Sequence, residues 1–301
     1  MTKKLLAFIL SFALLLSAVT VVPAFAEDEI TEWDGTVATG YAGGTGTKAD
    51  PYLISNGAEL AYMYRTVQDS GSAHSNNKYF KLTADIYLND TTDPDWLDNS
   101  PRAWYTSVAT NGYRFTGNFD GDGHTVYGIY YEGADGYQGL LPVMDTWNYD
   151  VTVKDLTVSD SFIASEGNIV GVISSRLYSQ NYKTAHFYNI NITDSVTVIG
   201  TGGDYVGGIL GFSNCDAKSY YQFSGCAIRA NISSGHALIG YGTAATVARI
   251  VQSYTTAADW YTTNSAQGET AYIIADASAI AGKEAAKAAL PNLDWLRMWG
   301  H

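Results

Sequence analysis

Three residues with acid–base or metal-binding side chains lie close together in the segment FTGNFDGDGHTVYGI (115–129). They are Asp120, Asp122 and His124. Two carboxylates at this spacing could act as an acid and a base, or could bind calcium with the histidine nearby. The same residues suit a glycine-rich turn, in which aspartate side chains accept hydrogen bonds from backbone amides and the histidine fills a polar position. We favour the turn and keep a catalytic site as the alternative.

A second acidic group occurs in NDTTDPDWLDNSPRAW (89–104), with carboxylates at Asp90, Asp93, Asp95 and Asp98. Calcium prefers oxygen ligands of this kind, so the segment could bind a calcium ion. Such a run is also typical of a solvated loop, and this is the interpretation we favour. We predict no cofactor and no metal, with calcium as the alternative.

Aromatic residues gather in segments that read as loops. Flat aromatic rings stack on sugar rings and also dominate protein–protein contacts, although half-buried tyrosines can equally cover the flank of a fold. The candidate ligand-binding residues are Trp147, Tyr149, Tyr178, Tyr182, Tyr220, Tyr221 and Trp260.

The elements that position these residues follow a repeat. Gly139, Gly171, Gly207 and Gly240 mark four apolar segments at intervals of 32, 36 and 33 residues. A second series lies between them: VKDLTVSDSF (153–162), FYNINITDSV (187–196) and FSGCAIRANI (223–232). Units of this length with short strands indicate stacked coils, in which the inward residues form one apolar column. A flat β-sandwich would explain the short strands but not the spacing.

Alternation within the strands supports the stacked coils. Leu156 and Val158 would point inward, and Ile190 and Ile192 would do the same in the next unit. A helix is predicted over 56–69, because Leu60, Met63, Tyr64 and Val67 fall on one helix face. A second helix is predicted over 281–290, before Pro291. The first helix and the segment AALPNLDWLRMW (288–299) could cover the open ends of a solenoid.

The segments GTGTKADPYLIS (44–55), YFKLTADIYL (79–88) and FTGNFDGDGHTVYGI, followed by IVGVIS (169–174) and YVGGILGF (205–212), carry a family resemblance. Together they resemble secreted bacterial right-handed β-helix proteins with GLUG-like repeats. The resemblance covers most of the chain after residue 26, closely at its start and loosely from residue 137 onward. It implies a parallel β-helix on exported or surface proteins and no single activity.

The predicted fold is therefore all-β: a right-handed parallel β-helix with a short N-terminal capping helix and a C-terminal helical cap. The expected divisions are a signal peptide (1–26), N-terminal strands and capping helix (27–111), β-helix coils (112–280) and the C-terminal cap (281–301).

The first 26 residues have a basic start, an apolar run and the cleavage-site pattern Ala24-Phe25-Ala26, which predicts a secretory signal peptide. Removing Lys3 and Lys4 with it changes the formal net charge from −13 to about −15. Nucleic acids and anionic membranes need a basic surface, so neither is an expected partner. No later segment is apolar and long enough to insert into a membrane. In an exported protein Cys215 and Cys226 could form a disulfide, and we favour that over two buried thiols.

These observations predict a secreted or cell-surface binding module of bacterial origin, without catalysis. Its expected ligand is a carbohydrate or another cell-envelope component, such as a surface protein. The alternatives are a polysaccharide-degrading hydrolase or lyase, which would need two carboxylates facing one groove, and a structural stalk or adhesin segment.

Overall fold

The structure is a computed structural model, and from Thr31 onward its described residues belong to one unit. The described residues are 30–107, 112–134, 137–166, 169–200, 205–215, 220–233, 235–242, 248–251, 253–255, 261–263, 269–270 and 273–274.

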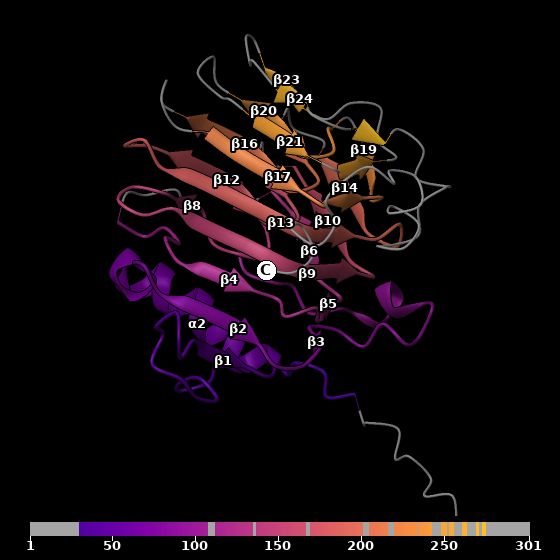
Figure 1. Cartoon of the computed structure of the whole chain (residues 1–301). Coiled ribbons are helices and arrows are strands. Elements are labelled where there is room, and N and C mark those ends of the chain that lie inside the picture. Colours follow the sequence, from indigo (N-terminus) through magenta and orange to yellow (C-terminus); the bar gives the residue numbers. More distant parts are fainter. Residues whose placement is uncertain are drawn as a thin grey trace, which may run out of the picture. The chain divides into compact units, whose positions relative to one another are not determined.

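The described chain is mostly strands, arranged in four sheets (Figure 1). The largest sheet, of 13 strands, contains β1 (Tyr52–Ile54), β2 (Tyr79–Leu82), β3 (Ile86–Tyr87), β4 (Asn118–Asp120), β5 (Thr125–Tyr127), β9 (Val151–Ser159), β13 (Thr184–Ile192), β17 (Tyr220–Ser224), β18 (Ala227–Ile228), β21 (Ala248–Val251), β22 (Ser253–Thr255), β24 (Glu269–Thr270) and β25 (Ile273–Ile274). The four-stranded sheet contains β6 (Tyr130–Gly133), β10 (Phe162–Ser165), β14 (Thr197–Gly200) and β19 (Asn231–Ser233). The three-stranded sheet contains β7 (Tyr137–Gln138), β11 (Ile169–Gly171) and β15 (Tyr205–Gly207). The five-stranded sheet contains β8 (Met144–Asp145), β12 (Ser174–Ser179), β16 (Leu210–Cys215), β20 (Ile239–Gly242) and β23 (Tyr261–Thr263).

Strands pair in parallel with the equivalent strands of the preceding and following repeats. In β10, Phe162 pairs with Tyr130 of β6 on one side and with Thr197 of β14 on the other. The colours of Figure 1 accordingly change in sequence order from strand to strand across the largest sheet. The predicted all-β class with repeat-to-repeat strand pairing is confirmed, and these parallel pairings differ from those of an antiparallel sandwich.

Alternate residues of the large sheet form the core. Phe80, Phe119, Val153, Phe187 and Phe223 occupy one register column through β2, β4, β9, β13 and β17, and none is more than 1% exposed. The inward positions predicted from alternation in 153–162 and 187–196 are also confirmed, because all four side chains are buried. The residues between these core positions face outward and are therefore available to form a site.

The predicted N-terminal helix is α2 (Gly57–Ser70). Asn56 caps it, because its side chain accepts a hydrogen bond from the Glu59 amide, while a Glu59 carboxylate oxygen accepts one from the Ser55 amide. The predicted apolar face is buried in the same cluster as residues of β1 and β2. Short 3-10 turns follow at Ser72–His74 and Trp96–Asn99.

The fourth glycine of the predicted repeat has a different partner from the one expected. Gly171 pairs with Gly207 as predicted, but Gly207 bridges to His236 and not to Gly240. Leu210 pairs with Ile239, which places Gly240 opposite Gly211. The repeat is shorter here than the glycine spacing implied, because His236 lies only 29 residues beyond Gly207.

The predicted signal peptide and the predicted C-terminal helix and cap lie outside the described residues. Within the part that is described, no helix combines the length and hydrophobicity needed to cross a bilayer.

Candidate functional site

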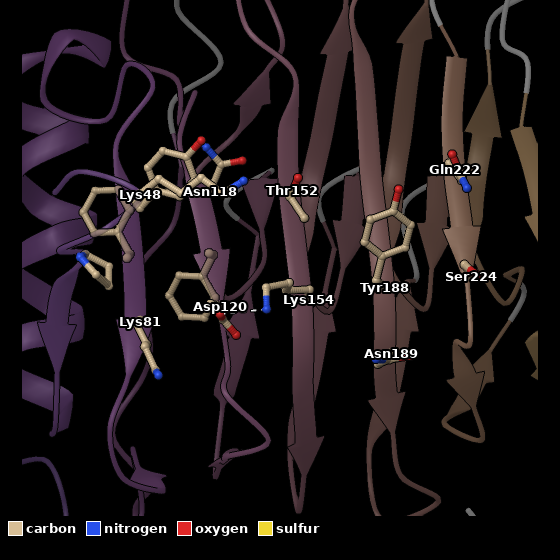
Figure 2. A pocket seen from close by; sticks show the side chains of 14 residues that line it. Lys48, Lys81, Asn118, Asp120, Thr152, Lys154, Tyr188, Asn189, Gln222 and Ser224 are labelled. Atoms are coloured by element: carbon tan, nitrogen blue, oxygen red, sulfur yellow. Dashed lines mark ion pairs between the residues drawn. The ribbon is translucent and has the colours of Figure 1, made fainter. Parts of the chain in front are cut away.

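A groove of about 960 Å³ lies on the outward face of the largest sheet (Figure 2). It crosses β2, β4, β9, β13 and β17, so it draws residues from five successive strands. Its lining residues are Lys48, Pro51, Tyr79, Phe80, Lys81, Asn118, Phe119, Asp120, Thr152, Lys154, Tyr188, Asn189, Gln222 and Ser224.

One row of outward side chains runs across the groove in register. Lys81 pairs with Asp120, Asp120 with Lys154, Lys154 with Tyr188, and Tyr188 with Ser224. Figure 2 shows these side chains on neighbouring strands. Because parallel strands lie about 4.8 Å apart, a ligand that contacts the whole row is extended over about 19 Å.

Asp120, Asp122 and His124 do not converge on one point. Asp120 pairs with Lys154 (2.8 Å), Asp122 pairs with Lys81 (2.8 Å), and His124 Nδ1 lies 3.1 Å from an oxygen of Asp85. The Asp122 amide donates to the Asp120 side chain (2.9 Å), and Asp122 has a left-handed φ of 51°. The structure therefore contains the predicted aspartate turn, and of the three residues only Asp120 lines the groove.

Lys154 links this row to a ladder of turn residues that the sequence analysis missed. Its ammonium also contacts Asp155 (2.8 Å), and Asn189 Nδ2 donates to the other oxygen of Asp155 (2.7 Å). Asp155 and Asn189 both have left-handed φ values, near 51°. Burial alone would lower the pKa of Lys154, but Asp120 and Asp155 raise it beyond its usual value. Lys154 is therefore a fixed cation at the centre of the groove.

A second row contains amide, hydroxyl and imidazole groups. Tyr79 pairs with Asn118, while Thr152, His186 and Gln222 continue the row in register. His186 Nδ1 lies 2.6 Å from the Tyr188 hydroxyl. Burial lowers the pKa of His186, although the nearby Asp150 carboxylate opposes this. His186 is therefore neutral at pH 7 and can hold the Tyr188 hydroxyl in place as an acceptor.

His186 should make the protein less stable in mild acid. Its folded-state pKa is below 6.5, so the unfolded chain takes up a proton that the folded chain resists, and stability is lost as pH falls through this range. The loss approaches about 1.4 kcal/mol per pH unit from this group. Urea unfolding at pH 7.5 and 5.5 should show a smaller pH effect for His186→Gln than for the wild type. Equal pH effects in the two proteins would contradict the assignment.

Three predicted aromatic residues are exposed in loops that lead into strands of the groove. Trp147 is 52% exposed and Tyr149 38% exposed, in the loop that leads into β9, while Tyr182, in the loop that leads into β13, is 66% exposed. Asn181 Nδ2 donates to the Trp147 carbonyl (2.6 Å), which joins the two loops. Asn181 and Tyr182 both have left-handed φ values (57° and 63°), which is unusual for a tyrosine.

The other predicted aromatic residues differ from this group. Tyr221 is fully buried, so its expected place in an exposed loop is wrong; the alternation of β17 points it inward beside the small Ala185. Tyr178 is half-buried, and the Arg114 guanidinium lies 3.6 Å from the centre of its ring. Trp260 and the side chain of Tyr220 lie outside the described residues.

The acidic segment forms its own turns. Asp90 accepts hydrogen bonds from the Thr92 amide and hydroxyl, and these lower its pKa. Asp93 accepts one from the Asp95 amide. Across the described residues, no group of three or more His, Cys, Asp or Glu side chains has a metal-binding arrangement. The acidic segment, including Asp98, therefore contains no such group.

Cys226 is buried, and its sulfur lies 3.4 Å from the Phe187 carbonyl oxygen. The side chain of Cys215 is not described, so the disulfide stays a prediction.

No model of a known protein family matches the chain. It is 32% identical over 183 residues to halomucin of Haloquadratum walsbyi, covering 60% of this chain and 2% of that protein. It is 29% identical over 141 residues to a provisionally named Gly-rich membrane protein of Evansella cellulosilytica, covering 46% of this chain and 14% of that protein. The chain thus spans a small part of each of these relatives. A solved structure from Bacteroides ovatus, provisionally assigned as an immunoglobulin A1 protease, is similar with a TM-score of 0.43 at 17% identity, covering 74% of this chain and 70% of that one.

Proposed function

We propose that this chain is an extracellular or cell-surface right-handed β-helix module that binds an extended neutral glycan in the groove. The parallel pairing of successive repeats supports the β-helix. The predicted signal peptide and the names of the two relatives, halomucin and a Gly-rich membrane protein, support a location outside the cell. Because the chain matches only a fraction of each relative, it could serve as one module among others.

The groove's mixture of polar groups carries the proposal. Sugar hydroxyls both donate and accept hydrogen bonds, and the groove offers amides at Asn118 and Gln222, hydroxyls at Thr152 and Ser224, and the ion-paired Lys154. Lys81 and Lys154 are paired with carboxylates, so these two lysines do not require an anionic ligand.

Aromatic rings supply the apolar part of a sugar site. Tyr79 and Tyr188 line the groove itself, and their rings can pack against the C–H face of a pyranose. Trp147, Tyr149 and Tyr182 extend this aromatic surface, because their loops lead into the first residues of β9 and β13. A sugar chain in the groove could therefore continue onto these exposed rings.

Tyr188→Ala should weaken binding of a neutral oligosaccharide about tenfold or more, because a central aromatic contact of this kind contributes roughly 2 kcal/mol. Neutral oligosaccharides on a glycan array would identify a binder, and calorimetry on that binder would give the affinities. Tyr113→Ala is a matched control, since Tyr113 is 38% exposed and does not line the groove.

Two outcomes would decide against this function. If no neutral glycan binds the wild-type chain, a stalk or adhesin segment is the better interpretation. If the wild type shortens the bound oligosaccharide on incubation, the chain is a polysaccharide-degrading enzyme. Hydrolysis normally uses a pair of carboxylates. Among the described residues that line the groove, Asp120 is the one carboxylate, and it forms an ion pair with Lys154.

A further inference from the structure

A second surface of unusual composition lies on other sheets than the groove. An arginine, Arg176, stands among aromatic side chains on the outward side of β7, β12 and β16. We call this group the arginine–aromatic face; it consists of Tyr137, Arg176, Tyr178 and Phe212, all of them half-buried. The Arg176 guanidinium carbon lies 5.1 Å from the ring centre of Tyr137, 5.7 Å from that of Tyr178 and 4.6 Å from that of Phe212. Such distances are typical of cation–π contacts.

Arg176 has no carboxylate partner among the described residues, although the chain is strongly acidic. Its Nη1 donates to the Tyr178 hydroxyl (2.8 Å), and its Nε is buried without a hydrogen-bond partner. No described residue accepts a hydrogen bond from its Nη2, and the Arg176 side chain as a whole is half-buried. A guanidinium with unused donors normally binds a carboxylate or phosphate.

The Tyr178 hydroxyl adds a second donor at the same place. Its oxygen accepts from Arg176, and no described residue accepts its own hydrogen. Arg114 covers the Tyr178 ring at 3.6 Å, but the charge of Arg114 is neutralised by Asp145 at 2.7 Å. The face therefore presents two donors, no competing acceptor and one uncompensated positive charge.

We propose that the arginine–aromatic face binds a uronic acid residue, a sugar with a carboxylate on its ring. The carboxylate accepts hydrogen bonds from Arg176 Nη2 and the Tyr178 hydroxyl, and the sugar ring packs on Tyr137. The ring centres lie 4.6–5.7 Å from the guanidinium carbon. A ligand that contacts both must therefore carry its negative charge and its stacking surface on one compact group. A pyranose ring bearing its own carboxylate meets this requirement. An acidic peptide meets it less well, because methylene groups separate its carboxylates from the backbone.

The test compares a tetragalacturonide with the same oligosaccharide after its carboxyl groups are reduced to alcohols. Calorimetry on the full chain should show the acidic oligosaccharide binding at least about tenfold more tightly than the reduced one, since a hydrogen bond to a charged group contributes roughly 1.5–3 kcal/mol. Equal affinities for the two probes would overturn the proposal. Tighter binding of a tetraglutamate peptide than of the tetragalacturonide would overturn it too, because the face would then be a peptide site.

Two variants locate the site. Arg176→Met keeps the bulk of the side chain and should abolish the preference for the acidic probe. Tyr178→Phe keeps the ring and should reduce that preference severalfold. Arg65→Met is the matched control, because Arg65 also lies over a tyrosine ring (Tyr105, 5.5 Å) but is paired with Asp69 (3.0 Å). If both face variants fold, as judged by circular dichroism, and bind the acidic probe like the control, the proposal is wrong. If Arg176→Met fails to fold, the result for Tyr178→Phe decides.

Discussion

Replacing Asp145 with alanine is expected to lower the free energy of unfolding by about 3–5 kcal/mol, because it removes the carboxylate that forms an ion pair with the buried Arg114 guanidinium. The Asp145 carboxylate lies 2.7 Å from Arg114, and the two side chains are only 6% and 8% exposed. The other Asp145 oxygen accepts a hydrogen bond from the Trp147 amide (2.8 Å), so that amide also loses its acceptor. Burial raises the pKa of Asp145, although its contacts with the Trp147 amide and Arg114 lower it.

Urea unfolding measures this loss, and the exposed ion pair provides the control. Asp69→Ala breaks the pair between Arg65 and Asp69, whose side chains are 46% and 52% exposed, and should change stability by less than about 1 kcal/mol. A double replacement, Arg114→Met with Asp145→Leu, should recover part of the stability lost in Asp145→Ala, because it removes both charges. A loss in Asp145→Ala no greater than that in Asp69→Ala would contradict this account.

The sequence alone was sufficient to predict the inward faces of β9 and β13. In β9 and β13, apolar residues alternate with polar ones, and this alternation placed Leu156, Val158, Ile190 and Ile192 in the core correctly. The pattern works because side chains of a strand point to opposite sides in turn, so a single buried face leaves a readable period of two.

The groove could not be predicted in the same way, because it depends on the register between repeats. Lys154 forms an ion pair with Asp120, and Asn189 forms a hydrogen bond with Asp155. In both pairs the partners are 34 residues apart in the sequence. The repeats differ in length, as the shift at Gly240 shows, so sequence spacing does not fix which outward residues become neighbours. The sequence indicated Asp120 as a candidate site residue, but no motif indicated its partner Lys154.

Adjacent tyrosines show a second limit. The segment KSYYQF places Tyr220 and Tyr221 side by side, and in a strand only one of two neighbours can face the core. Tyr221 is the inward one: it pairs with Ala185, which leaves room for its ring, and its hydroxyl donates to the Leu177 carbonyl (3.3 Å). Both tyrosines were expected to be exposed because the segment was interpreted as a loop. In the structure, Tyr220–Ser224 forms strand β17.

Phe187→Ala should lower the free energy of unfolding by about 3–5 kcal/mol, the typical loss for removing a fully buried phenylalanine. Phe187 is 0% exposed and stacks on Phe223 of the next repeat, with ring centres 5.1 Å apart. Its neighbours in β13, His186 and Tyr188, face the other way, and Tyr188 lines the groove. A cavity beneath this strand should therefore also weaken binding of the neutral oligosaccharide in the variant that remains folded.

Unfolding in urea and calorimetry with the same oligosaccharide separate the two effects. Tyr182→Ala serves as the control for stability, since a side chain that is 66% exposed should change it by no more than about 0.5 kcal/mol. Phe187→Leu, which refills most of the volume, should restore much of the stability and, if the groove depends on the core beneath it, the binding as well. If Phe187→Ala lost stability while binding the oligosaccharide like the wild type, the packing of β13 would not control the groove.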